Sequence, residues 1–159
     1  LHDALPISYG LTQADYDTRT PHAWSAGPQT TLLRNQVAAM RDGETFVMTI
    51  PKAPYRCPPG PYERACVVAD YLKQAKGRNC RVIVLDENST IQAERHTFET
   101  AFTQIHGDIV EYVPGVSGIV IDAASKFVSY ADALGATRQI QAQVVNPIVP
   151  HRATGSAPG

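Results

Sequence analysis

The residues best suited to chemistry lie together in one proline-rich loop, which runs from Pro51 to Pro61. Cys57 is near its centre, between Arg56 and Arg64, and a predicted helix begins at Pro61. A helix N-terminus and nearby cations both favour a thiolate over a thiol. The flanking prolines stiffen the loop and hold the sulfur in one direction. The pattern predicts a reactive thiol at Cys57, although a lone loop cysteine is more often a small, inert residue.

Glu63 is the second candidate for a chemical role. It follows Cys57 by six residues and falls in the first turn of the predicted helix. A carboxylate there could move protons for a neighbouring thiol or for sulfide. The plainer interpretation is that it only offsets the helix dipole.

The other cysteines, Cys66 and Cys80, are interpreted as packing residues of a helix and a strand. Three cysteines are an odd number, so one thiol is left over whichever two might pair, which indicates a partner outside the chain. The sequence has no CxxC pair and no cysteine or histidine cluster with zinc spacing, and its five histidines are scattered. We therefore expect no metal site.

The position of the Cys57 loop is informative, because it follows the short apolar strand predicted at Phe46–Ile50. In a dinucleotide-binding domain this turn carries G-x-G-x-x-G, which lets the backbone approach a pyrophosphate. Here prolines remove amide donors and Gly60 is the one glycine left, so we expect no NAD(P)H binding. Asp86, at the end of the next strand, could reach a ribose hydroxyl, but without the glycines that signal carries little weight.

The elements that must position this loop follow from hydrophobic periodicity and turn signals. Helices are predicted over 30–40, from Pro61 onward and over 91–106; strands are predicted over 46–50, 81–85 and 109–113. Strand, helix, strand, helix, strand in that order predicts a right-handed parallel βαβαβ unit.

The C-terminal third predicts further strands. They cover 118–122, 126–130 and 139–147, with a turn or a short helix at 131–135 and a return strand at 144–149. Residues 9–30 are polar, are interrupted by prolines and are interpreted as a connecting segment. The expected fold is therefore α/β: a Rossmann-like, three-layer βαβαβ parallel sheet with an antiparallel β appendage, like the NAD(P)H-domain part of a two-dinucleotide flavoprotein.

Size and composition fit a folded domain with no special surface. The chain has 159 residues, 43% of them hydrophobic, and a formal charge of -1, which argues against nucleic acid as a partner. No apolar run approaches the roughly 20 residues of a transmembrane helix, and no secretory signal is visible.

The predicted organisation has four parts. Residues 1–20 form an N-terminal segment, 21–42 a linker and a leading helix, 43–152 the Rossmann-like domain, and 153–159 a tail. Residues 1–8 look like a translated sequencing-adapter stretch and are left out of the fold prediction. The chain also opens on leucine rather than methionine. We therefore expect a fragment of a longer protein.

Several segments together resemble one known family. They are His22–Trp24 with the residues up to Arg34, the loop Arg56–Ala65, the strand Val82–Asp86, and Asn146–Arg152. Their pattern resembles the flavoprotein subunit of flavocytochrome c sulfide dehydrogenase, and the likeness runs from about Pro21 to Arg152. The cysteine loop is the most specific part of it.

The resemblance implies an enzyme that binds FAD in a separate Rossmann domain and pairs with a c-type cytochrome in the bacterial periplasm. Sulfide would attack a redox-active disulfide near the flavin, and electrons would pass to FAD and then singly to haem. The resemblance makes Cys57 one cysteine of that disulfide. It makes Glu63 the glutamate near the flavin, a proton acceptor.

The sequence differs from the family by what it lacks. The glycine fingerprint for FAD, the second active-site cysteine and the later flavin-contacting segments are absent, and neither Cys66 nor Cys80 matches the missing cysteine. We therefore expect the isolated 159 residues to be inactive, with FAD affinity lost or very weak. Residues 116–143 are assigned no function.

Two alternatives stay open. A sulfide:quinone oxidoreductase would use the same cysteine chemistry but deliver electrons to quinone, and the Cys57 loop favours the cytochrome-linked family over it. A non-catalytic Rossmann-like interaction module is the alternative from another class.

Overall fold

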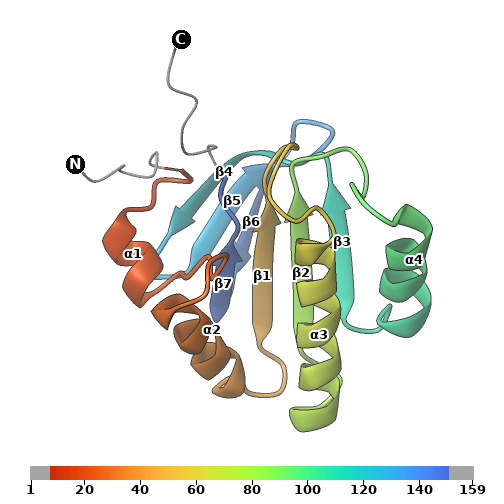
Figure 1. The fold of residues 1–159 in the computed structure, drawn as a ribbon, viewed down its shortest axis with the longest axis horizontal. Helices are drawn as coiled ribbons and strands as arrows, with labels where there is room; N and C mark the ends of the chain where they lie inside the picture. Colours follow the sequence, from red (N-terminus) through yellow and green to blue (C-terminus); the bar gives the residue numbers. More distant parts are fainter. Residues whose placement is uncertain (1–7, 151–159) are drawn as a thin grey trace.

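A four-stranded parallel sheet forms the centre of the molecule in the computed structural model, which describes residues 8–150 (Figure 1). Its strands lie in the order β3-β2-β1-β7. Their bounds are β1 (Thr45–Ile50), β2 (Arg81–Asp86), β3 (Val110–Pro114) and β7 (Val144–Pro147). The strand order reverses at β1, which pairs with β2 on one side and with β7 on the other.

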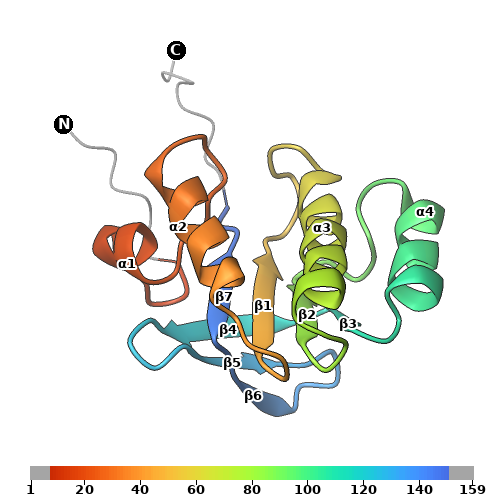
Figure 2. The same ribbon diagram turned by 90° about the horizontal axis from the view of Figure 1, so that it is seen from below.

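Helices cover one face of this sheet and a second sheet covers the other (Figure 2). The helices are α2 (Pro28–Ala38), α3 (Gly60–Ala75) and α4 (Arg95–Thr100), which continues as the π-helical segment η1 (Ala101–Ile105). The second sheet is antiparallel and contains β4 (Ser117–Asp122), β5 (Phe127–Ala131) and β6 (Thr137–Gln141). The structure thus confirms the predicted three-layer α/β fold with its antiparallel appendage.

The molecule has two hydrophobic cores, one on each face of the parallel sheet, because both faces of that sheet are buried. In β1, Phe46, Met48 and Ile50 pack among the helices, whereas Val47 packs toward the antiparallel sheet. A strand with apolar side chains on both faces is typical of central parallel sheets, and it explains why this run is continuously apolar. The antiparallel strands alternate instead: in β5, Val128 and Tyr130 are buried and their neighbours are less so.

One helix was missed by the sequence prediction, which treated residues 9–30 as a connecting segment. Helix α1 (Gln13–Thr18) begins with a capping box, in which Thr12 and Asp15 satisfy each other's backbone amides. Leu11 and Tyr16 anchor it in the core on the antiparallel-sheet side. The signal Thr-x-x-Asp was present in the sequence, but the helix is too short to show a periodic apolar stripe.

The helix predicted over 91–106 begins four residues later than expected. Ile91 is buried in the preceding loop, and the backbone amide of Gln92 donates to the Tyr62 hydroxyl at 3.1 Å. Glu94 then adopts a left-handed conformation, with φ of 47°. These tertiary contacts hold the residues before Arg95 out of the helix.

The stretch predicted as strand over 139–147 is two strands in two sheets. It leaves β6 at Gln141 and joins β7 at Val144. At the crossing, the Gln143 backbone amide donates to the Thr45 carbonyl, and its side-chain oxygen accepts from the Thr45 amide at 2.7 Å. The segment at 131–135 is a turn, closed by the Gly135 amide on the Asp132 carbonyl. The predicted tail at 153–159, most of the 1–8 stretch and Arg152 lie outside the described residues.

Candidate functional site

The Cys57 loop joins the carboxyl end of β1 to the first turn of α3 (Figure 1). Open α/β folds place their ligands at this edge, and the reversal of strand order at β1 marks the same position. The Cys57 side chain is exposed, as a reactive thiol requires. The structure therefore places Cys57 at the carboxyl end of the parallel sheet, and its chemical role stays a prediction.

Cys57 has an unusual backbone. Its φ of 56° lies in the left-handed region, which costs a residue with a side chain about 1–2 kcal/mol. The Cys57 carbonyl accepts a 2.9 Å hydrogen bond from the Gly60 amide, which closes the turn that starts α3. Such conformations persist only where surrounding contacts impose them.

Those contacts begin at the base of the loop. The Asn88 side chain donates to the Pro51 carbonyl at 2.9 Å, and its oxygen accepts from the Ala53 amide at 2.9 Å. Within the loop, the Tyr55 hydroxyl donates to the Pro58 carbonyl at 3.0 Å. The loop is thus fixed on both sides of Cys57.

A segment far away in sequence, Pro21–Trp24, forms the outer support of the loop. The Trp24 indole donates to the Arg56 carbonyl at 3.1 Å, and the Arg56 guanidinium donates to the Trp24 carbonyl in return. Trp24 is buried in the main core.

Arg64 and Asn146 hold this segment in place. The Arg64 guanidinium donates to the carbonyls of His22 and Ala23 at 3.0 and 2.7 Å and to the Asn146 side-chain oxygen at 3.2 Å. Asn146 is fully buried in β7, and its amide group donates to the carbonyls of Pro21 and His22. Burial lowers the pKa of Arg64.

The two arginines that were expected to favour the Cys57 thiolate thus direct their hydrogen bonds to the Pro21–Trp24 segment. Both arginines lie near the loop, as their positions in the sequence indicated. Their hydrogen bonds hold the loop and the Pro21–Trp24 segment together. A spacing argument could not identify their partners, which lie 32 to 82 residues away.

Glu63 lies in the first turn of α3, as predicted, and is exposed. Its negative charge acts on the thiol one turn further along: burial, followed by the Glu63 charge, raises the pKa of Cys66. A proton-transfer role for Glu63 beside Cys57 stays a prediction.

Asp86 forms a buried polar centre beneath the loop. Its carboxylate accepts 2.7 Å hydrogen bonds from the hydroxyls of Tyr62 and Tyr112, and it also accepts from the backbone amide and the side chain of Asn88. Burial raises the pKa of Tyr62, and its hydrogen bond to Asp86 raises that pKa further. Asp86 therefore supports Asn88, which in turn fixes the base of the Cys57 loop.

The residues in this region do not fit a dinucleotide. The ribose position predicted at Asp86 is already filled by tyrosine and asparagine donors. At the pyrophosphate position, Pro58 and Pro59 offer no amide hydrogens. The space over Gly60 is taken too, because a Cβ atom there would lie 2.7 Å from the Trp24 ring. FAD, like NAD(P)H, thus has no phosphate cradle among these residues.

The other two cysteines match their interpretation as packing residues. Cys80 is buried, and its thiol lies 3.3 Å from the Arg41 carbonyl. Cys66 is half-buried against the main core. All three cysteines of the chain are free thiols in this structure.

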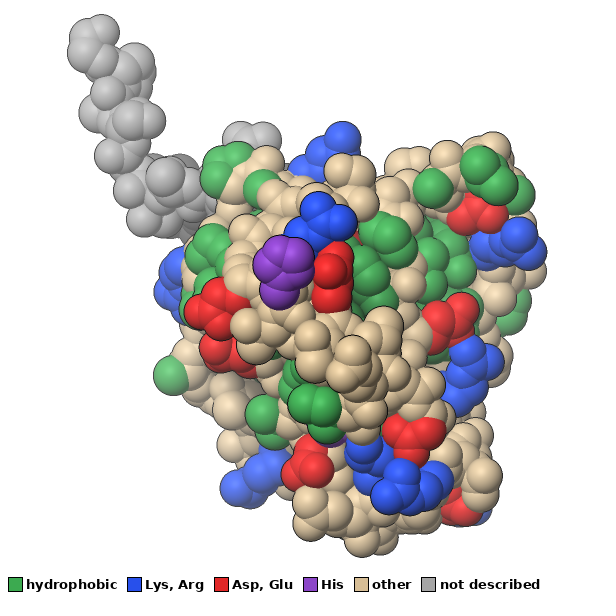
Figure 3. All heavy atoms as spheres, turned by 90° about the vertical axis from the view of Figure 1, so that its right-hand side faces the viewer, with side chains coloured by type: hydrophobic (Ala, Val, Ile, Leu, Met, Phe, Trp, Pro, Cys, Tyr) green, Lys and Arg blue, Asp and Glu red, His purple; other side chains and the backbone are tan. Residues whose placement is uncertain are grey.

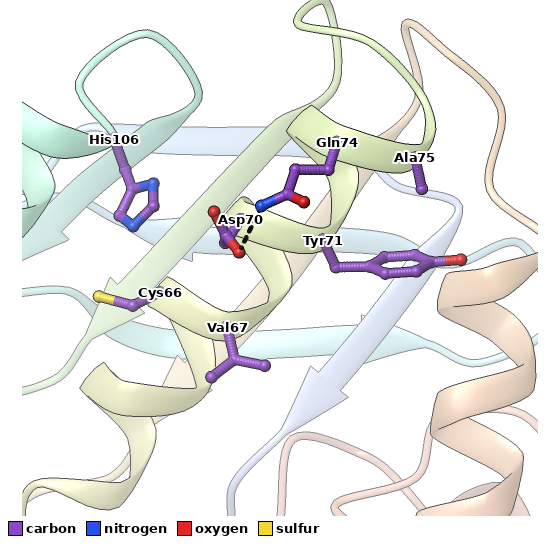
Figure 4. Close-up of a pocket in the computed structure, with 7 residues that line it drawn as sticks. All are labelled: Cys66, Val67, Asp70, Tyr71, Gln74, Ala75 and His106. Carbon is purple, nitrogen blue, oxygen red and sulfur yellow. Dashed lines mark hydrogen bonds between the residues drawn. The ribbon is translucent and has the colours of Figure 1, made fainter.

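A groove of about 650 Å³ runs along the outer side of α3, away from the Cys57 loop (Figure 4). Cys66 and Asp70 line it from α3, and His106 lines it from the residue after η1; Asp70 accepts a hydrogen bond from Gln74. Burial and the charge of Lys73 lower the pKa of His106.

The face around α4 and the edge strand β3 is chemically mixed (Figure 3). Hydrophobic side chains gather there in a recess between acidic and basic groups, lined in part by Ile91, Phe102 and Tyr112. Within residues 8–150, no set of three histidine, cysteine or acidic side chains is arranged to hold a metal ion. No helix in the same range is long and apolar enough to cross a membrane.

Together, the sheet order and the antiparallel appendage define a class: an α/β, Rossmann-like domain, here with a cysteine loop in place of a glycine loop. Residues 30–150 match the central part of the sulfide dehydrogenase (flavocytochrome c) flavoprotein chain. The chain belongs to that family.

Two solved structures share the fold. The sulfide:quinone oxidoreductase of the hyperthermophilic bacterium Aquifex aeolicus aligns with a TM-score of 0.55 and 18% identity, over 77% of this chain and 28% of that chain. A chain in the mitochondrial ATP synthase of Tetrahymena thermophila aligns with a TM-score of 0.56 and 13% identity, over 83% of this chain and 32% of that one. This chain thus spans less than a third of the length of either matched chain.

Proposed function

We propose that this chain is the part of an FAD-dependent sulfide dehydrogenase that supplies one cysteine of a redox-active disulfide, Cys57. The observation that carries the proposal is an exposed thiol held at the ligand edge of the sheet by a loop fixed on both sides. Membership of the sulfide dehydrogenase family supports the choice of substrate.

The proposed reaction is a thiol–disulfide exchange with sulfide as the nucleophile. In the oxidised enzyme Cys57 is bonded to a cysteine outside this chain. Hydrosulfide attacks one sulfur, the S–S bond breaks, a new S–S bond forms to the substrate sulfur, and the other cysteine leaves as a thiolate. The substrate sulfur loses two electrons and the disulfide gains them.

Glu63 is proposed to take the proton that hydrogen sulfide releases as it becomes hydrosulfide. An exposed carboxylate in the first turn of α3 can exchange that proton with solvent.

Regeneration of the disulfide has two parts. A second hydrosulfide takes the bound sulfur away as disulfane (H2S2), which leaves both cysteines as thiolates, and an acceptor then removes two electrons from them. We propose FAD as the first acceptor, followed by a c-type cytochrome in the bacterial periplasm. The β1–α3 loop offers FAD no phosphate cradle, so we place its binding site in other parts of the flavoprotein. The family description supports both the flavin and the cytochrome.

The test uses the full-length flavoprotein with Cys57→Ser. Sulfide-dependent flavin reduction should fall by about 100-fold or more, with FAD still bound, because serine cannot form the disulfide. Cys66→Ser is the matched control, because Cys66 lies half-buried on α3, the helix that follows the loop, and it should retain full reduction. Unchanged reduction in Cys57→Ser would remove the proposal. Reduction of a quinone rather than cytochrome c by the parent protein would select the quinone-linked alternative.

A further inference from the structure

We infer that Trp24 is a positioning residue for Cys57: its indole ring forms the wall that sets the direction of the Cys57 sulfur. The expected effect on sulfide oxidation rests on the proposed function, whereas the expected effect on the thiol itself does not. The first observation is the paired contact between Trp24 and Arg56, the residue before Cys57. Two hydrogen bonds in opposite directions fix the ring relative to the Cys57 backbone.

The ring and the sulfur also meet at one point, over Gly60. A Cβ atom built on Gly60 would lie 2.7 Å from Cη2 and 3.0 Å from Cζ2 of Trp24, and 3.1 Å from Sγ of Cys57. Gly60 is in the first turn of α3 with an ordinary negative φ, so its backbone does not require glycine. What requires glycine is the space that the indole and the thiol share.

The indole cannot easily turn away from the sulfur. It is 8% exposed, and the Arg64 guanidinium lies over its face, 4.9 Å from the ring centre. Arg64 in turn bonds to the backbone of His22 and Ala23 and to Asn146. Trp24 is thus held by Arg56 and Arg64, and Asn146 of β7 holds Arg64 in place.

This arrangement matters because Cys57 is otherwise exposed. An exposed cysteine side chain chooses among staggered rotamers, and a rigid wall on one side removes some of them. A disulfide exchange needs the three sulfurs in line, and a misplacement of about 1 Å can lower a rate by about 100-fold. The indole therefore acts on the reaction through the thiol.

The experiment uses the full-length flavoprotein with Trp24→Phe, Gly60→Ala and the two combined. Trp24→Phe keeps an aromatic ring but removes Cζ2, Cη2 and the indole N–H. Gly60→Ala places a methyl group where ring and sulfur meet, at a helical position that alanine favours. Both variants should keep FAD and their thermal unfolding midpoint within a few degrees of the parent.

Two rates are measured. After chemical reduction, iodoacetamide labelling of the Cys57 peptide, followed by mass spectrometry, should change by about threefold or more in each single variant. Sulfide-dependent flavin reduction should fall by about tenfold or more. In the combined variant, Gly60→Ala should change Cys57 labelling much less than it does with Trp24 present, because the sulfur can then move away from the methyl group into the space that Cζ2 and Cη2 leave.

Cys57 labelling that stays within about twofold of the parent in both single variants would overturn the inference, as would strictly additive effects in the combined variant. The proposed function fails by a different result, unchanged flavin reduction in Cys57→Ser. Because labelling needs neither sulfide nor flavin turnover, it decides the role of Trp24 in either case.

Discussion

At the scale of single residues, the two candidate side chains differ in how firmly the structure places them. Cys57 is held by contacts on both sides of its loop, in a left-handed conformation that those contacts impose. Glu63 is exposed, and its charge helps to raise the pKa of Cys66. Residue chemistry alone therefore supports Cys57 more strongly than Glu63.

The link between Glu63 and Cys66 gives a testable pH dependence. Burial and the Glu63 charge both raise the pKa of Cys66, so its thiolate fraction near pH 7 is lower than that of an ordinary thiol. Glu63→Gln removes one of these causes, lowers the pKa, and should speed alkylation of Cys66 by about twofold at pH 8. The gain should vanish above the Cys66 pKa, where the thiol is ionised in both proteins.

The measurement is a pH series of iodoacetamide labelling, read at the Cys66 peptide. Glu94→Gln is the matched control, because Glu94 is also exposed but sits at the start of α4. Equal labelling profiles for Cys66 in the parent and in Glu63→Gln would show that the carboxylate does not act on this thiol.

At the scale of elements, the buried carboxylate of Asp86 connects β2, α3 and β3. It accepts from Tyr62 on α3, from Tyr112 on β3, and from Asn88 just beyond β2. Because Asn88 also bonds to Pro51, the same group supports the base of the Cys57 loop. Stability and loop geometry thus depend on one buried side chain.

Asp86→Ala should therefore destabilise the fold by roughly 3 kcal/mol or more, because several buried donors lose their acceptor at about 1–3 kcal/mol each. Tyr112→Phe, which removes one hydroxyl and keeps the ring, should cost only about 1 kcal/mol. Urea unfolding of each variant measures both values. Equal costs for the two variants would contradict the central role of Asp86.

The element scale also shows what the sequence could and could not predict. Periodicity found every strand of the parallel sheet because strands such as β1 are apolar throughout and end at turn signals. It missed α1, which is too short for a stripe, and it started α4 too early because the Gln92–Tyr62 contact is tertiary.

The same limit applied to the candidate site. Local spacing singled out Cys57 and its loop, because thiol, prolines and helix start are adjacent in sequence. Asn88 could have been expected to form a turn with Asp86 two residues before it. Its contacts with Pro51 and Ala53, and those of Arg64 with Asn146, join residues 35 to 82 positions apart. No local pattern encodes such pairs.

At the scale of the whole molecule, the described chain starts and finishes at neighbouring positions. The Tyr9 hydroxyl donates to Glu87 at 3.1 Å and lies 3.5 Å from the Ile148 carbonyl in the segment after β7. Tyr9 also accepts from the Ile121 amide through its carbonyl. The first and the last described residues therefore lie close together on the same side of the molecule.

This proximity predicts that the order of the segments can be changed. A circular permutant that joins Pro150 to Ser8 through a short glycine-serine linker, and opens at Leu134 in the exposed turn after β5, should fold. Leu134 is 94% exposed. The circular dichroism spectrum of this permutant should match that of the parent, and its free energy of unfolding should be lower by about 2 kcal/mol or less.

The matched control opens the chain between Pro58 and Pro59 with the same linker. That cut frees the loop that Tyr55 and Trp24 hold, and it should cost clearly more stability than the cut at Leu134. A permutant opened at Leu134 that fails to fold would show that β5 and β6 must be connected.

Trp24 is the one tryptophan in the sequence, and its ring lies beside the Cys57 sulfur. Thiolates and disulfides both quench indole emission, and they do so to different extents at close range. In this chain the tryptophan emission, as distinct from that of the seven tyrosines, therefore originates from a single residue at the loop. The intensity of the Trp24 emission should therefore report the oxidation state of the Cys57 sulfur, without an added dye.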